Sequence, residues 1–78
     1  MTFTTFQSYK EWCINVTENE ALSVRTLEDK PNSIMLEDMQ ICDPILLMEI
    51  VLSAYDSGFI LGGFFANEGN GSLIIYED

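Results

Sequence analysis

One segment dominates the sequence: residues 43–58 read DPILLMEIVLSAYDSG. Asp43 is a favoured N-cap residue, and Pro44 falls in the first turn, where a missing backbone N–H does no harm. Gly58 suits the left-handed conformation in which many helices end. These start and stop signals predict a helix between Asp43 and Gly58.

The predicted helix is apolar around most of its circumference. Only Glu49, Ser53 and Asp56 are strongly polar, and helical spacing places them on one narrow face. We expect a sheet to cover one side of this helix, and the first helix or another chain to cover most of the rest. Because full burial of a Leu- or Ile-sized side chain is worth ~1.5–3 kcal/mol, we expect this helix to be the centre of the fold.

An earlier helix is predicted at residues 6–16, with Thr4 or Thr5 as its N-cap. The aromatic members of its apolar stripe are expected to face the core, and an exposed anchor for a partner is the alternative. The stripe follows helical spacing and consists of Phe6, Tyr9, Trp12, Cys13 and Val16.

The remaining segments favour strands. Residues 21–29 alternate apolar with polar side chains, and a turn cluster at residues 29–32 leads on to residues 33–41. Residues 33–41 alternate poorly, so a returning strand and a short helix both fit them. Residues 59–66 and 72–78 flank an Asn-Gly pair, which is a strong hairpin signal.

The resulting order of elements is α-β-β-α-β-β. It favours a small two-layer α+β domain, in which two helices cover an antiparallel sheet of about four strands. A chain of 78 residues has room for a single domain, residues 1–78. We expect residues 73–76 to form an open sheet edge, and Gly62 with Gly63 to form a bulge or a close backbone approach.

The charge balance excludes two classes of partner. The sequence contains thirteen acidic residues, only three basic ones and no His, so the formal net charge is −10. A nucleic-acid-binding protein needs Lys and Arg to replace counterions along the phosphate backbone, and an anionic membrane surface repels a chain of this charge. We therefore expect neither direct nucleic-acid binding nor membrane binding.

The sequence contains no catalytic, cofactor or metal motif. Without His a nucleophilic triad lacks its usual base, and two Cys residues cannot complete a structural zinc site. We therefore expect no enzymatic activity, no cofactor and no metal. The start of the chain lacks the pattern of a signal peptide, so Cys13 and Cys42 are expected to be free thiols in the cytoplasm.

The acidic residues occur in pairs at predicted turns and strand ends. If the two hairpins lie side by side, these pairs would form a negative surface that attracts a basic protein. In size, charge and lack of motifs the chain resembles the DNA-mimic and anti-defence proteins of phages and mobile elements, such as anti-CRISPR and anti-restriction inhibitors. The leading hypothesis is an acidic inhibitor that docks on the nucleic-acid-binding surface of another protein. The residues expected to stand in for phosphates are Glu18, Glu20, Glu28, Asp29, Glu37 and Asp38.

The alternative hypothesis rests on the apolar segments. Phe64 and Phe65 are adjacent, as are Ile74 and Ile75, so both faces of the second hairpin carry apolar side chains. One face of a small antiparallel sheet is normally solvated. This pattern favours a homo-oligomeric or accessory subunit, a homodimer for example, whose apolar helix and hairpin are buried against another chain.

Overall fold

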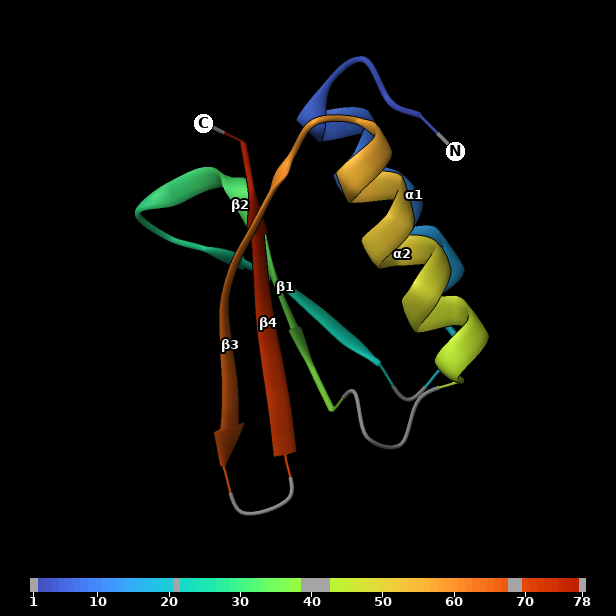
Figure 1. The fold of residues 1–78 in the computed structure, drawn as a ribbon, viewed down its shortest axis with the longest axis vertical. Coiled ribbons are helices and arrows are strands. Elements are labelled where there is room, and N and C mark those ends of the chain that lie inside the picture. Colours follow the sequence, from blue (N-terminus) through green and yellow to red (C-terminus); the bar gives the residue numbers. More distant parts are fainter. Residues whose placement is uncertain (1, 21, 39–42, 68–69, 78) are drawn as a thin grey trace.

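The computed structural model describes residues 2–20, 22–38, 43–67 and 70–77, and it has the α+β architecture expected from the sequence. Two helices and a four-stranded antiparallel sheet follow one another in the order α-β-β-α-β-β (Figure 1). The elements are α1 Phe6–Val16, β1 Ser23–Leu27, β2 Lys30–Glu37, α2 Pro44–Asp56, β3 Ile60–Asn67 and β4 Asn70–Tyr76.

The predicted caps close both helices. Of the two candidates for α1, Thr5 is the N-cap, and its side chain accepts a hydrogen bond from the backbone N–H of Ser8 at 3.2 Å. The Asp43 carboxylate accepts from the backbone N–H of Ile45 at 3.0 Å, which caps α2 as expected. Beyond α2, Gly58 has a φ of 81°, a conformation that costs other residues energy because of their Cβ atom.

The strand order is β1-β2-β4-β3, so the two hairpins meet along β2 and β4. Ser33 pairs with Tyr76 and Leu36 with Leu73 across this junction. The expectation of an open edge at residues 73–76 is therefore wrong: β4 is bonded on both sides, and the edge strands are β1 and β3. Local hairpin signals could not show which strand of each hairpin would face the other.

Both hairpins form, with turns that differ from the expected ones. The first turn is at Glu28 and Asp29, and Lys30 already pairs with Leu27. Residues 33–37 continue this strand, so the alternative of a short helix is wrong there, while residues 39–41 lie outside the described residues. In the second hairpin Asn70 pairs with Asn67, so the Asn-Gly pair belongs to β4, and the connecting residues 68 and 69 are not described.

The expected bulge at Gly62 is present. The register of β3 against β4 shifts between Leu61 and Phe64. A Cβ atom at Gly62 would lie 2.8 Å from the Tyr76 ring and 3.3 Å from the Ile74 carbonyl oxygen. The ring of Tyr76 thus occupies the space that a side chain at position 62 would need.

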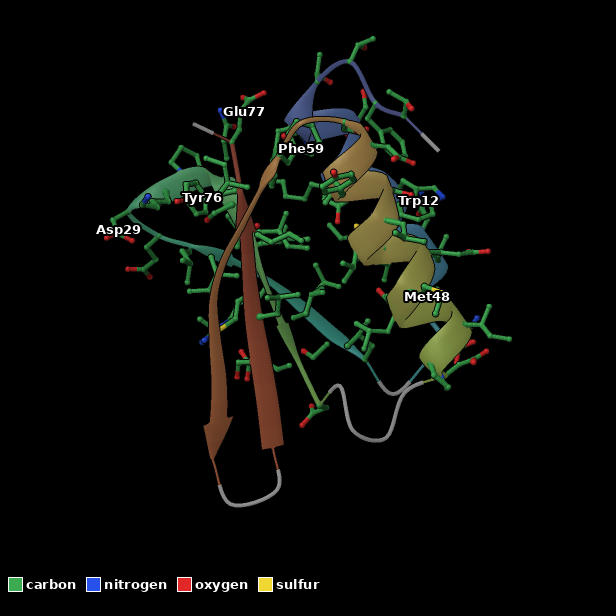
Figure 2. All side chains as sticks on the ribbon, viewed as in Figure 1. Trp12, Asp29, Met48, Phe59, Tyr76 and Glu77 are labelled. Atoms are coloured by element: carbon green, nitrogen blue, oxygen red, sulfur yellow. The ribbon has the colours of Figure 1, made fainter. Side chains whose placement is uncertain are left out.

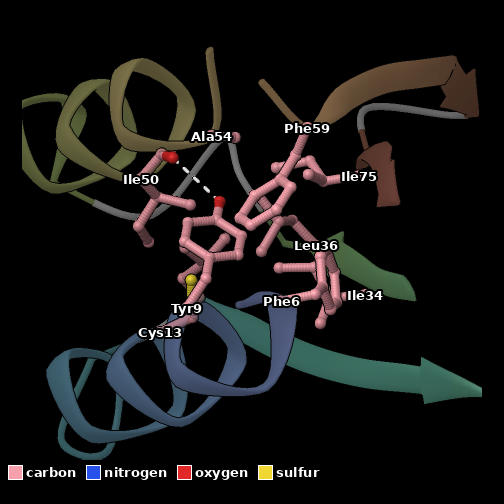
Figure 3. Close-up of a cluster of buried hydrophobic side chains, with 10 residues drawn as sticks. Phe6, Tyr9, Cys13, Ile34, Leu36, Ile50, Ala54, Phe59 and Ile75 are labelled. Atoms are coloured by element: carbon pink, nitrogen blue, oxygen red, sulfur yellow. Dashed lines mark hydrogen bonds between the residues drawn. The ribbon is translucent and has the colours of Figure 1, made fainter. Parts of the chain in front are cut away.

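The hydrophobic core lies between the helices and one face of the sheet (Figures 1 and 3). Aromatic rings from α1 meet Phe59, which precedes β3: its ring centroid is 5.0 Å from that of Phe6 and 5.3 Å from that of Tyr9. Trp12 is half-buried against this core. The buried hydrophobic residues are Phe6, Tyr9, Cys13, Leu22, Ile34, Leu36, Ile50, Ala54, Phe59 and Ile75.

Tyr9 joins the two helices. Its side chain is fully buried, and its hydroxyl donates a 2.8 Å hydrogen bond to the Ile50 carbonyl oxygen of α2 (Figure 3). Burial raises the pKa of Tyr9 well above its ordinary value, and the nearby Cys13 adds to the shift. Burial also raises the pKa of the Cys13 thiol to about 12, although the Tyr9 hydroxyl partly opposes this shift.

These two groups predict alkaline unfolding. Both keep their protons in the folded state at a pH where the unfolded chain loses them, so the free energy of unfolding should fall as the pH rises above about 9. Two protons correspond to a slope of at most ~2.7 kcal/mol per pH unit. Urea unfolding between pH 8 and 11 measures this slope. Tyr9→Phe removes one of the two titrating groups and should reduce the slope by up to about half. Equal stability across that range would contradict the prediction.

Candidate functional site

Four of the six acidic residues expected to bind a partner lie in two groups at opposite ends of the first hairpin. Glu28 and Asp29 form its turn, whose tip is marked by Asp29 in Figure 2. Glu37 and Asp38 are at the other end of β2, where Glu37 pairs with Ser23 at the start of β1. The structure therefore does not bring the six residues together on one surface. The remaining two residues, in the connection from α1 to β1, are Glu18 and Glu20.

Glu37 is only partly available to a partner. Its carboxylate lies 3.0 Å from the guanidinium of Arg25, and its side chain is only 37% exposed. The same Arg25 side chain donates to the sulfur of Met35 at 3.3 Å. An exposed ion pair of this kind contributes about 0–1 kcal/mol to stability, so its main effect is to offset the charge of Glu37.

At the turn end, a shallow cavity of about 230 Å³ combines charges of both signs. The Lys30 ammonium lies 4.5 Å from the centroid of the Tyr76 ring, and the Asn32 amide donates to the Glu77 carboxylate at 3.3 Å. Glu77 therefore adds a carboxylate near Asp29 that was not among the six expected site residues. The cavity is lined by Asp29, Lys30, Pro31, Asn32, Tyr76 and Glu77.

The outer face of α2 is apolar and exposed. Ser53, on the narrow polar face of the helix, is only 2% exposed, and α2 packs on the core through Ile50 and Ala54. Met48, seen at the helix surface in Figure 2, is one of four large apolar residues that point outward. Their exposed fractions are Ile45 68%, Met48 60%, Leu52 51% and Tyr55 72%. These residues form a continuous strip, which we call the α2 strip.

A groove runs beside the α2 strip, on the side of α1. Its volume is about 270 Å³, and Trp12 contributes an aromatic ring to its lining. Two carboxylates, Glu49 and Asp56, lie along its α2 wall together with Leu52 and Ser53. The polar residues of α2 therefore border the groove, and the outermost surface of the helix is left to apolar side chains.

The described residues offer no alternative centre of metal chemistry, since they contain no group of three or more Cys, Asp or Glu side chains placed to hold a metal ion. Cys13 is buried, and Cys42 lies outside the described residues. No helix in the described part of the chain is long and apolar enough to span a membrane. No protein-family model, curated protein or solved structure matches this chain.

Substitutions along α2 should separate the α2 strip from the core. Ile50→Ala removes a fully buried side chain and should lower the free energy of unfolding by ~2–5 kcal/mol. Leu52→Ala shortens a half-exposed side chain of similar size and should change the free energy of unfolding by less than about 1 kcal/mol. Urea unfolding of both variants checks this difference. A loss at Leu52 as large as that at Ile50 would show that the α2 strip supports the fold of the isolated chain.

Proposed function

We propose that this protein is a small acidic inhibitor that docks on the basic, nucleic-acid-binding surface of a cytoplasmic protein and blocks it. The observation that carries the proposal is the placement of its cations. Arg25 pairs with Glu37, Lys30 lies over Tyr76, and the Lys10 ammonium donates to the Pro31 carbonyl oxygen at 3.3 Å. Arg25 therefore offsets Glu37, whereas Lys30 and Lys10 contact uncharged groups. Within the described residues, Glu18, Glu20, Glu28 and Asp29 form no ion pair.

The distance between the two acidic groups supports the proposal. β2 has eight residues, so its ends are roughly 25 Å apart at about 3.3 Å per residue. A duplex groove of that length holds about seven base pairs at 3.4 Å each. Glu28 and Asp29 at one end, and Glu37 and Asp38 at the other, would contact two separate clusters of Lys and Arg along such a surface. Glu18 and Glu20 lie in the connection that leads into β1, whose first residue pairs with Glu37. Two-ended contact of this kind excludes nucleic acid without requiring one continuous row of carboxylates.

Charge reversal tests the proposal once a partner has been captured from the source cell and identified by mass spectrometry. Glu28→Lys should weaken binding to this partner about two- to tenfold at low salt, because the introduced ammonium would repel the Lys and Arg side chains of the partner's basic surface. Glu11→Lys is the matched control, since Glu11 is an exposed acid of α1 outside both acidic groups. Isothermal titration calorimetry measures both variants.

Competition and salt provide the decisive readouts. A nucleic-acid duplex should compete with the protein for the captured partner, and affinity should fall steeply between low and physiological ionic strength. A partner that binds duplex and this protein simultaneously would contradict the proposal. So would equal effects of Glu28→Lys and Glu11→Lys.

The α2 strip supports a second candidate function. An accessory or oligomeric subunit would bury this strip against another chain, because contiguous exposed apolar surface commonly marks an interface. Met48 and Tyr55 are 60% and 72% exposed on the outer face of the helix. Retention of a partner in high salt would favour this function over the acidic inhibitor.

A further inference from the structure

The α2 strip has the spacing of a helix-pairing seam. Its residues Ile45, Met48, Leu52 and Tyr55 are separated by three, four and three positions. This is the a-d-a-d spacing of a heptad repeat, in which apolar side chains of one helix fit between those of a facing helix. Ile50, at the f position opposite the seam, is fully buried in the core. The helix therefore has one side that packs on its own domain and a heptad seam on the other.

The charges beside the seam are one-sided. Glu49 and Asp56 occupy the two e positions of this heptad, and Pro44 and Val51 occupy the g positions. The e and g residues of paired helices determine which partner is accepted, because they face each other across the seam. In this protein the e flank is acidic, and it borders the groove against Trp12.

We propose that the α2 strip is the docking surface for a basic amphipathic helix of the partner protein. The apolar side of that helix packs on the a and d residues, and its Lys or Arg residues face Glu49 and Asp56. The groove accepts one such side chain, with its aliphatic stem against Leu52 and its charge near the Trp12 ring and the two carboxylates. This inference rests on the proposed function in one respect, the basic character of the partner.

A second copy of this chain is a poorer occupant on charge grounds. In an antiparallel pair the e residues would face each other, which places Glu49 and Asp56 of one copy against the same acids of the other. In a parallel pair they would face Pro44 and Val51, which carry no charge. Neither arrangement supplies a cation, and each copy carries a formal charge of −10. A basic partner helix can place Lys or Arg opposite Glu49 and Asp56 in either the parallel or the antiparallel orientation.

Designed peptides test this surface with the full chain. The probe is a three-heptad helical peptide with Leu at a and d and Lys at e and g, and its control carries Glu in place of Lys. Fluorescence anisotropy should show binding of the Lys peptide and at least about tenfold weaker binding of the Glu peptide, since like charges would then face Glu49 and Asp56. Equal binding of the two peptides would overturn the proposal.

Substitutions locate the binding to the seam. Leu52→Lys should weaken the Lys peptide by about tenfold or more, because it places a charge at the centre of the apolar contact. Glu49→Lys should weaken it about two- to fivefold, the effect of one exposed ion pair, and should strengthen binding of the Glu peptide. Ile14→Lys is the matched control for Leu52→Lys, since Ile14 is equally exposed, at 50% against 51%, and lies on α1. Circular dichroism verifies that each variant is folded.

Three further outcomes are decisive. Concentration-dependent dimers that disappear in Leu52→Lys would identify a second copy as the occupant and overturn the proposal. Loss of peptide binding in Ile14→Lys as well as Leu52→Lys would overturn it by showing nonspecific adhesion. If Leu52→Lys binds the captured partner normally while Glu28→Lys does not, this inference fails and the proposed function stands. If the Lys peptide binds at the seam but the captured partner binds no nucleic acid, only the proposed function fails.

Discussion

The arrangement of the two helices depends on one buried group, the hydroxyl of Tyr9. An unpaired hydroxyl in a dry core would cost about 1–3 kcal/mol, and its bond to the Ile50 carbonyl oxygen removes that cost. The bond can form only when the Ile50 side of α2 faces α1. Together with the burial of Ile50 and Ala54, the bond fixes the rotation of α2 about its axis, and this rotation turns Met48 and Leu52 away from the core.

The structure separates two kinds of surface that the sequence mixes. Acidic groups lie at both ends of the first hairpin, where Glu28 and Asp29 form a turn. Apolar side chains lie on the outer side of α2, with acids only along the flank that borders Trp12. The long-range attraction of the acidic groups and the short-range packing of the α2 strip are different physical effects, since salt screens the attraction between charges but does not weaken apolar burial. A partner with a basic surface and an amphipathic helix would use both.

The fold could be predicted from the sequence because its signals are local. Asp43, Pro44 and Gly58 mark the ends of α2, and Thr5 caps α1, without reference to the rest of the chain. The side of α2 that faces the core could not be predicted. A helix that is apolar nearly all round has no hydrophobic periodicity to show which side faces the core. That side is set by contacts distant in sequence, among them the hydrogen bond from Tyr9 to Ile50. The separation of the acids follows from the pairing of β1 with β2, which places Glu37 and Glu28 at opposite ends of the first hairpin. The approach of Glu77 to Asp29 could not be predicted, because it depends on the pairing of β2 with β4. For the α2 strip, the heptad spacing was the signal that could have revealed the surface.

The junction of β2 with β4 also has a consequence for folding kinetics. Each hairpin can form from residues close in sequence, but the sheet is complete only when Ser33 pairs with Tyr76, which lies in the other hairpin, beyond α2. Closing so long a loop is slow compared with forming a hairpin, so the junction is expected to limit the folding rate. Until it closes, β2 and β4 each present an unbonded edge of matching register. At high protein concentration during synthesis or refolding, the β4 edge of one molecule can pair with the β2 edge of another, which makes exchange of hairpins between molecules the expected route of misassembly.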